Sequence, residues 1–176
     1  MTIRRVVTGT ACDGRSVVAR DDRVEPVTVS ALPGYSWHKL WEFDERPKDP
    51  ADSRVHTGLS HFPPPDGVRF NIYTVPPSST VRPPLTEAAR HELGVKLPGR
   101  GEHMESDQAG MHRTASVDLV IVLAGKISLD LDDGVSVDLQ TGDTLVQNGT
   151  RHSWRNDSDA PCTMAVVLLG ASAQQS

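Results

Sequence analysis

Short apolar runs separated by turn sequences fill the C-terminal part of the chain. Four of them are Val117–Leu123, Ile127–Leu131, Val135–Leu139 and Thr163–Leu169. Each run has the length of one β-strand, and the Ala-Gly-Lys and Asp-Asp-Gly sequences between the first three are typical of turns. The pattern predicts a β-meander over the first three runs, with His112 before it and His152 after it.

The N-terminal part shows the same pattern with longer interruptions. Strands are expected over residues 3–7, 16–19, 35–43 and 68–75. In residues 35–43 aromatic and polar positions alternate, which predicts a strand with its aromatic side chains on one face. In residues 68–75, Val68, Phe70 and Ile72 alternate with polar neighbours, as in a half-buried strand. Residues 45–67 are rich in Pro, Asp and Ser, and we expect a long surface loop there.

One short helix is expected, from Thr86 to Leu93. Thr86 can cap its first turn, two alanines favour it, and Gly94 can end it. Residues 98–110 are polar and contain glycine, so they are expected to form a loop that leads into the meander. Residues 171–176 are expected to be a polar tail.

Composition narrows the class of protein. The 176 residues are enough for one domain with a real core, and the net charge of −5 offers no basic field for nucleic acid or anionic lipid. The two cysteines, Cys12 and Cys162, are far apart, which favours free thiols in a reducing cytoplasm. No segment has the length and apolarity of a signal peptide or a membrane span. We therefore expect a soluble cytoplasmic protein without nucleic-acid or membrane partners.

Polar side chains gather at both ends of the predicted meander. Residues two apart share one face of a strand, so His112, Thr114, Ser116 and Asp118 are expected on the same side. Such a polar face needs water, a ligand or a metal to satisfy it. At the other end, an Asn-Gly turn precedes His152, and Trp154 shares its face. The two faces would form the walls of a pocket.

Residues 111–170 resemble the core of the cupin superfamily, which consists of small jelly-roll barrels. The first family motif has two histidines one residue apart, then a glutamate and a glycine; these positions hold His112, Thr114, Asp118 and Gly125. In the second motif, Gly142, His152 and Asn156 stand in register, while Asn148 occupies the proline position and Thr150 the last glycine position. The resemblance implies an all-β cupin double-stranded β-helix with N-terminal extension strands and one short helix. We expect a single domain, with residues 1–100 as extension, 101–170 as barrel core and 171–176 as tail.

The resemblance also implies a divalent metal, Fe, Mn, Ni or Zn, which the family holds with three histidines and a glutamate. Here the candidate ligands are His112, Asp118 and His152, while Thr114 replaces the second histidine. Two histidines and one carboxylate also suit non-haem iron. Alternatively, Asp118 bonds Arg113 or Thr114 and serves the barrel alone.

Further residues near the predicted pocket are candidates for substrate contact or catalysis. The candidate substrate contacts are Thr114, Trp154, Phe70 and Gln147, and the candidate catalytic residues are His112 and His152. Either the loop residues His103 and Glu105 supply a missing ligand or base, or solvent surrounds them. The remaining histidines, His38, His56, His61 and His91, are expected to be surface or packing residues.

Two classes of function follow. The first is an enzyme that acts on a small organic molecule by metal-assisted decarboxylation, dehydration or isomerisation, or by a non-haem iron dioxygenase reaction. The second is a metal-free binding or accessory protein. Cupins of this size often dimerise, and the aromatic run at residues 35–43 exceeds the needs of one small barrel, so a homodimer is also expected.

Overall fold

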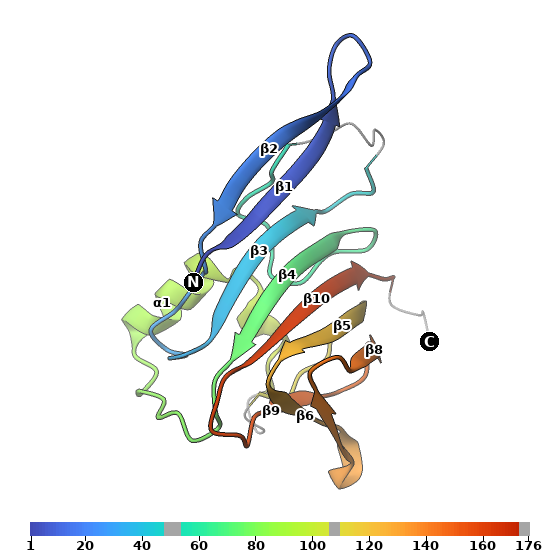
Figure 1. Ribbon diagram of the computed structural model, residues 1–176. Helices are drawn as coiled ribbons and strands as arrows, with labels where there is room; N and C mark the ends of the chain where they lie inside the picture. Colours follow the sequence, from blue (N-terminus) through green and yellow to red (C-terminus); the bar gives the residue numbers. More distant parts are fainter. Residues whose placement is uncertain (48–53, 106–109, 173–176) are drawn as a thin grey trace.

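The computed structural model describes residues 1–47, 54–105 and 110–172 (Figure 1). Its strands are β1 Ile3–Thr10, β2 Ser16–Val24, β3 Ser36–Phe43, β4 Val68–Val75, β5 Ser116–Ala124, β6 Lys126–Asp130, β7 Ser136–Gln140, β8 Thr144–Asn148, β9 Ser153–Arg155 and β10 Cys162–Gly170. The helices are α1 Glu87–Lys96 and the short 3₁₀ turns η1 Arg100–His103 and η2 Asp132–Gly134. The predicted all-β class with one α-helix is confirmed.

The strands form two facing sheets and a separate hairpin. The larger sheet has the order β3-β4-β10-β5-β8, the smaller one has the order β7-β6-β9, and β1 pairs only with β2. All pairings are antiparallel. β10 therefore lies between β4 and β5, so the middle strand of the larger sheet joins the N-terminal and C-terminal parts of the chain.

The predicted meander is wrong at its first turn. β5 and β6 follow each other in the sequence but lie in different sheets, and only β6 and β7 form a hairpin. Gly125, between β5 and β6, has φ 87°, and a Cβ at this position would lie 2.8 Å from the carbonyl oxygen of Pro161. This glycine allows the chain to cross from one sheet to the other where a side chain would collide with the backbone.

The aromatic residues of β3 do not share one face, contrary to the prediction. A bulge shifts the register between Lys39 and Trp41, so Trp37 lies opposite Tyr73 while Trp41 lies opposite Phe70 on the other face. Phe70 is 38% exposed. The inward face of β4 instead carries its polar residues, among them Arg69, which is 1% exposed and donates to three backbone carbonyls and to Asp44.

Helix α1 begins as predicted but extends further. The Thr86 hydroxyl accepts a hydrogen bond from the Ala89 amide at 3.2 Å. The helix passes through Gly94, which has no positive φ, and ends at Lys96; the amide of the next residue, Leu97, donates to the Leu93 carbonyl. Leu97 is almost fully buried. Its burial favours the extra turn, and a glycine alone does not stop a helix.

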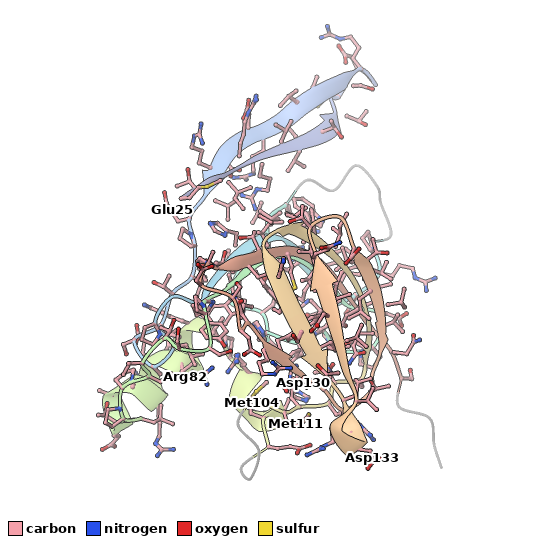
Figure 2. The ribbon with its side chains drawn as sticks, turned by 60° about the horizontal axis from the view of Figure 1, so that its bottom comes forward. Glu25, Arg82, Met104, Met111, Asp130 and Asp133 are labelled. Atoms are coloured by element: carbon pink, nitrogen blue, oxygen red, sulfur yellow. The ribbon has the colours of Figure 1, made fainter. Side chains whose placement is uncertain are left out.

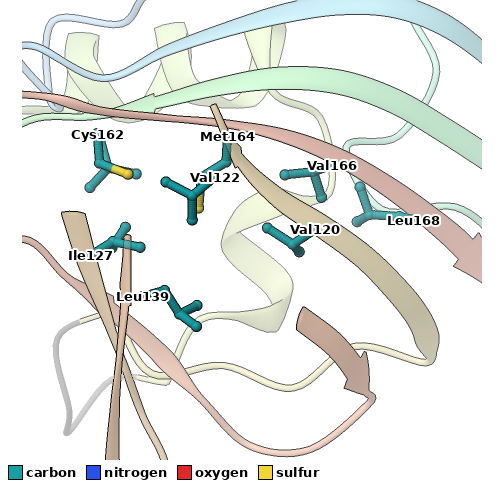
Figure 3. Close-up of a cluster of buried hydrophobic side chains, with 9 residues drawn as sticks. Val120, Val122, Ile127, Leu139, Cys162, Met164, Val166 and Leu168 are labelled. Carbon is teal, nitrogen blue, oxygen red and sulfur yellow. The ribbon is translucent and has the colours of Figure 1, made fainter. Parts of the chain in front are cut away.

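The main hydrophobic core lies between the two sheets (Figure 3). It contains Val75, Val120, Val122, Ile127, Leu139, Cys162, Met164, Val166 and Leu168. Alternate residues of β5 and β10 point into it, while their neighbours Leu119 and Leu169 are exposed on the outer face. The inward-facing residues of β5 and β10 therefore form much of the apolar filling between the two sheets.

The β1–β2 hairpin projects beyond the outer edge of β3 in Figure 1. Arg5 donates to the Leu40 carbonyl at 2.9 Å, and a His38 ring nitrogen lies 2.8 Å from the Met1 carbonyl. Among the described residues, no helix is long and apolar enough to span a membrane. Because the aromatic run of β3 is divided between two faces, it offers no single aromatic surface, and the homodimer stays a prediction.

The predicted connecting segments are described in part. The loop expected at residues 98–110 contains η1, and its residues 106–109 lie outside the described ranges. The expected loop at 45–67 is irregular where it is described, and its residues 48–53 lie outside those ranges. The tail begins with Ala171, whose amide donates to the Ala115 carbonyl at 2.9 Å, and residues 173–176 also lie outside.

Candidate active site

A cavity of about 130 Å³ lies between the sheets and takes its walls from both parts of the chain. From the C-terminal part come Gly110, His112, Asp118, Val120, Gln147, His152, Trp154, Met164, Val166 and Leu168. From the N-terminal part come Leu32, Tyr35, Trp37, His61, Phe62, Tyr73, Thr74, Val75, Arg82 and Arg100. Aromatic and aliphatic side chains predominate, and a few polar groups converge among them, as is typical of small-molecule sites.

His112 and His152 lie side by side in this cavity. Their backbones form a two-residue antiparallel bridge in which each amide donates to the other carbonyl at 2.9 Å. Their imidazole centroids are 4.3 Å apart, with the ring planes at 48°. The structure thus brings together two histidines that are distant in the sequence, as the motif spacing predicted.

The backbone also fixes the tautomer of both rings. Nδ1 of His112 lies 3.0 Å from the Gly110 carbonyl oxygen, and Nδ1 of His152 lies 2.9 Å from the Thr150 carbonyl oxygen. A carbonyl only accepts, so each Nδ1 carries the hydrogen and each Nε2 keeps its lone pair. Burial lowers the pKa of both rings, that of His112 to about 4 with a smaller contribution from His152. Both rings are therefore neutral at pH 7.

Asp118 lines the same cavity but does not join the histidines. It lies on β5 opposite Gln147 of β8, and its Oδ1 has no hydrogen-bond partner. Burial raises the pKa of its carboxyl to about 6. Across residues 1–47, 54–105 and 110–172, no three His, Cys, Asp or Glu side chains are close enough to hold a metal ion. The predicted set of His112, Asp118 and His152 is therefore not assembled in the described residues, where only the two histidine rings lie together.

The four predicted substrate contacts have different positions. Trp154 lines the cavity edge-on to His152, with the ring centroids 6.1 Å apart, and Gln147 lines it too. Thr114 is buried, but its hydroxyl bonds Ser116 at 3.0 Å and it does not line the cavity. Phe70 lies on the outer face of the larger sheet, because the inward positions of β4 alternate with it.

The two loop residues near the motif also differ. Glu105 forms a two-point ion pair with Arg151, at 2.7 and 2.5 Å, and Arg151 also binds Asp132. This pairing lowers the pKa of Glu105 and commits both its oxygens, so Glu105 is neither a free ligand nor a free base. The ring of His103 contacts Phe62, with centroids 4.8 Å apart, and lies behind the cavity wall.

Sequence reasoning missed the aromatic wall opposite the histidine pair. His61, predicted to be a surface or packing residue, lines the cavity and stacks on Tyr73 at 6.0 Å, with Phe62 edge-on at 4.8 Å. Phe62 in turn reaches His112 at 6.1 Å. Burial lowers the pKa of His61 far below its ordinary value, so this ring is neutral as well. His61 comes from an irregular segment with no periodicity, so no pattern pointed to it.

Comparison with known proteins agrees with this geometry. Residues 101–168 match the family model described as Cupin domain. Phomopsin biosynthesis cluster protein D of Diaporthe leptostromiformis is 56% identical over 70 residues, which is 37% of this chain and 37% of that protein. The cupin-domain-containing oxidoreductase virC of Hypocrea virens is 40% identical over 62 residues, 34% of this chain and 32% of that protein. The matched region thus spans about a third of each relative.

Solved structures are similar at a lower level of identity. A predicted oxalate decarboxylase from Thermotoga maritima is 17% identical, with a TM-score of 0.46, and the alignment covers 87% of this chain and 98% of that chain. The family match begins at η1 and ends within β10, and so includes both histidines. Residues 101–168 therefore match the cupin domain family.

Proposed function

We propose that this protein is an enzyme that transforms a small organic molecule in the cavity, by a metal-assisted decarboxylation, dehydration or isomerisation. The observation that carries the proposal is the histidine pair. Two neutral imidazoles, 4.3 Å apart, both direct their hydrogen to a backbone carbonyl and keep Nε2 unprotonated. Each Nε2 can therefore bind a metal or accept a proton without first losing one.

The two Nε2 atoms fit a divalent metal such as Fe, Mn, Ni or Zn, for which imidazole is a suitable ligand. His112 and His152 would hold it, and water or substrate would complete its coordination. When bound, the metal would polarise a carbonyl or carboxylate oxygen of the substrate as a Lewis acid. The two backbone carbonyls that bond Nδ1 would keep both rings oriented toward it.

Asp118 is the group best placed to move a proton. Its Oδ1 is buried without a partner, and its pKa of about 6 lies near neutrality, where a carboxyl both takes up and gives back a proton readily. Val120, Met164 and Leu168 also line the cavity and give it an apolar, buried wall near Asp118. If no metal is bound, His112 and His152 are themselves available as bases.

Oxidation by non-haem iron is the second candidate. It is favoured by the name of the Hypocrea virens relative, a cupin-domain-containing oxidoreductase whose matched region is 40% identical. The same two histidines would serve this chemistry. A metal-free binding role is the third candidate, and the measurement of metal content described below distinguishes it from the two enzymatic functions.

The test is the metal content of the full chain purified without a histidine tag. We expect about one divalent ion per chain by mass spectrometry, and its loss in His112→Ala and in His152→Ala, since two nitrogens hold it. His91→Ala is the matched control, because His91 is exposed on α1 and should leave the metal in place. A folded wild-type protein that stays metal-free after addition of Fe, Mn, Ni and Zn would overturn the metal-assisted proposal.

A further inference from the structure

Two arginines line the cavity wall contributed by the N-terminal part of the chain. Arg100 opens η1, and its guanidinium lies 5.7 Å from the Trp37 ring centroid. Arg82 lies 5.5 Å from the Tyr35 ring centroid and donates to the Tyr35 hydroxyl at 2.9 Å. Tyr35 and Trp37 are themselves stacked, 5.9 Å apart with ring planes at 14°. The two stacked rings therefore support both guanidinium groups at one place.

These two arginines differ from most others in the protein because they lack an acidic partner. Arg4, Arg5, Arg69, Arg151 and Arg155 all form ion pairs with aspartate or glutamate. Over the described ranges, neither Arg82 nor Arg100 pairs with a carboxylate, and Arg100 has only its aromatic contact. Burial lowers the pKa of Arg100, and the positive charge of Arg82 contributes. A partly desolvated cation without a counter-ion calls for an anion.

The opposite end of the cavity shows how such an anion would be oriented. The charge of Arg100 lowers the pKa of His61 and of His112, so both rings lie within its electrostatic reach. Asp118 is the single acidic residue among those that line the cavity in the described part of the chain, and its Oδ1 bonds to neither arginine. The two arginine charges thus exceed the single carboxylate charge among these lining residues, and the excess of positive charge lies at the arginine end.

We infer that Arg82 and Arg100 bind the carboxylate of the substrate, and that an apolar or aromatic body then extends past Tyr73 toward His112 and His152. This inference rests on the proposed function, since it names the substrate class for the same cavity. Guanidinium groups match a carboxylate with two parallel hydrogen bonds, which lysine cannot do. Arg82 uses one nitrogen to donate to the Tyr35 hydroxyl, and its other N–H groups and those of Arg100 remain for the carboxylate. Figure 2 labels Arg82 in the chain beside α1.

A second cavity reinforces the assignment. It measures about 760 Å³, lies beside α1, and shares Leu32, Arg82 and Arg100 with the first. The arginines thus stand at the junction between the histidine cavity and a wider space lined by residues of α1. A carboxylate can reach them through that space while the rest of the molecule occupies the histidine end.

The test is calorimetric titration of the full chain with 3-phenylpropionate and with its neutral amide. We expect the acid to bind about tenfold or more tightly than the amide, and Arg100→Gln and Arg82→Gln each to remove about tenfold of the affinity for the acid alone. Arg90→Gln is the matched control, because Arg90 lines only the second cavity. Arg82 is exposed, so its variant should fold normally even if Arg100→Gln does not.

Comparison with His152→Ala separates this inference from the proposed function. Acid binding that survives in His152→Ala but falls in the arginine variants places the carboxylate at the arginines, whether or not a metal is present. Acid binding that is lost in His152→Ala and unchanged in Arg82→Gln and Arg100→Gln would overturn the inference and leave the metal site standing. Equal binding of acid and amide, or no binding of the acid at about 10 mM, would also overturn it.

Discussion

The two walls of the cavity differ in how they are built. The C-terminal wall comes from strands and a backbone bridge, and its functional groups, His112 and His152, are held by reciprocal main-chain hydrogen bonds. Much of the N-terminal wall comes from irregular segments and one 3₁₀ turn, and its groups are held by ring stacking and by cations over rings. Backbone hydrogen bonds thus position the functional groups of the C-terminal wall, and side-chain contacts position those of the N-terminal wall.

This difference separates the two tasks of an enzyme site. Groups that must keep a fixed separation are best placed on the backbone of a sheet, because sheet geometry varies little. Groups that select a ligand can come from loops, where a change of side chain alters the contact surface without disturbing strand pairing. The family match covers the first wall, from residue 101 to residue 168, and leaves almost all of the second outside it.

The largest expected effect concerns the strand that joins the two walls. Leu168 of β10 is 2% exposed and belongs to the core, so Leu168→Ala should lower the free energy of unfolding by about 2–5 kcal/mol. Leu169→Ala is the control: this residue is 37% exposed on the other face, and its loss should cost less than about 1 kcal/mol.

Unfolding of Leu168→Ala in denaturant should be followed by circular dichroism and by tryptophan fluorescence. Coincident transitions are expected, because Trp37 and Trp154 lie on opposite walls and the strand order joins them through β10. Two separate transitions would show that the walls fold independently, and would contradict our expectation of a single domain over residues 1–176.

A smaller effect is expected at His61, on the side-chain-built wall. His61→Ala removes a buried ring from contacts with Tyr73 and Phe62, and should cost about 1–3 kcal/mol of stability while the metal content stays unchanged. His61→Phe keeps a ring of similar size and should recover most of that stability. Loss of metal from His61→Ala would show that metal binding at the C-terminal wall also depends on the N-terminal wall.

The smallest effect is expected at Asp118 and depends on pH. Its pKa in the folded protein, about 6, lies above the ordinary value of 3.8, so the folded state disfavours the ionised form. That cost is absent below about pH 4 and complete above about pH 7. Asp118→Asn does not ionise, and in chelator-treated protein it should be more stable than the wild type by about 1–2 kcal/mol at pH 8, but not at pH 3.5.

Asp159→Asn is the control for this pH series, since Asp159 is exposed and does not line the cavity. A uniform loss of stability in Asp118→Asn at all pH values would point instead to a purely structural role for the Asp118 carboxylate in the barrel.

The sequence predicted the histidine pair because motif spacing reflects backbone geometry. Strand alternation and a turn glycine place His112 and His152 at defined positions, and the structure brings them together. The prediction failed at β3, where one bulge residue reversed the face of the following aromatic ring. It also failed at Phe70 of β4, because the inward positions of that strand are those that alternate with Phe70. An inserted residue leaves no trace in a hydrophobic pattern that is already irregular.

The sequence pattern could not predict the arginine pair or His61 as site residues, for a different reason. Arg82, Arg100 and His61 come from three segments that are distant in the sequence; Arg82 and His61 lie in irregular chain, and Arg100 opens the short 3₁₀ turn η1. Their meeting depends on the long-range packing of loops against β3 and β4, which has no local signal. The mistaken meander has the same origin, because strand order is a property of the folded sheet.

The reciprocal backbone bridge between residues 112 and 152 has a consequence for how this site could change over generations. The distance between the two positions is set by atoms that every amino acid except proline possesses. A single-codon change at either position would therefore present a different functional group at an unchanged separation. New reactivity could therefore arise at this pair through single substitutions, while the backbone hydrogen bonds between the two positions stay the same.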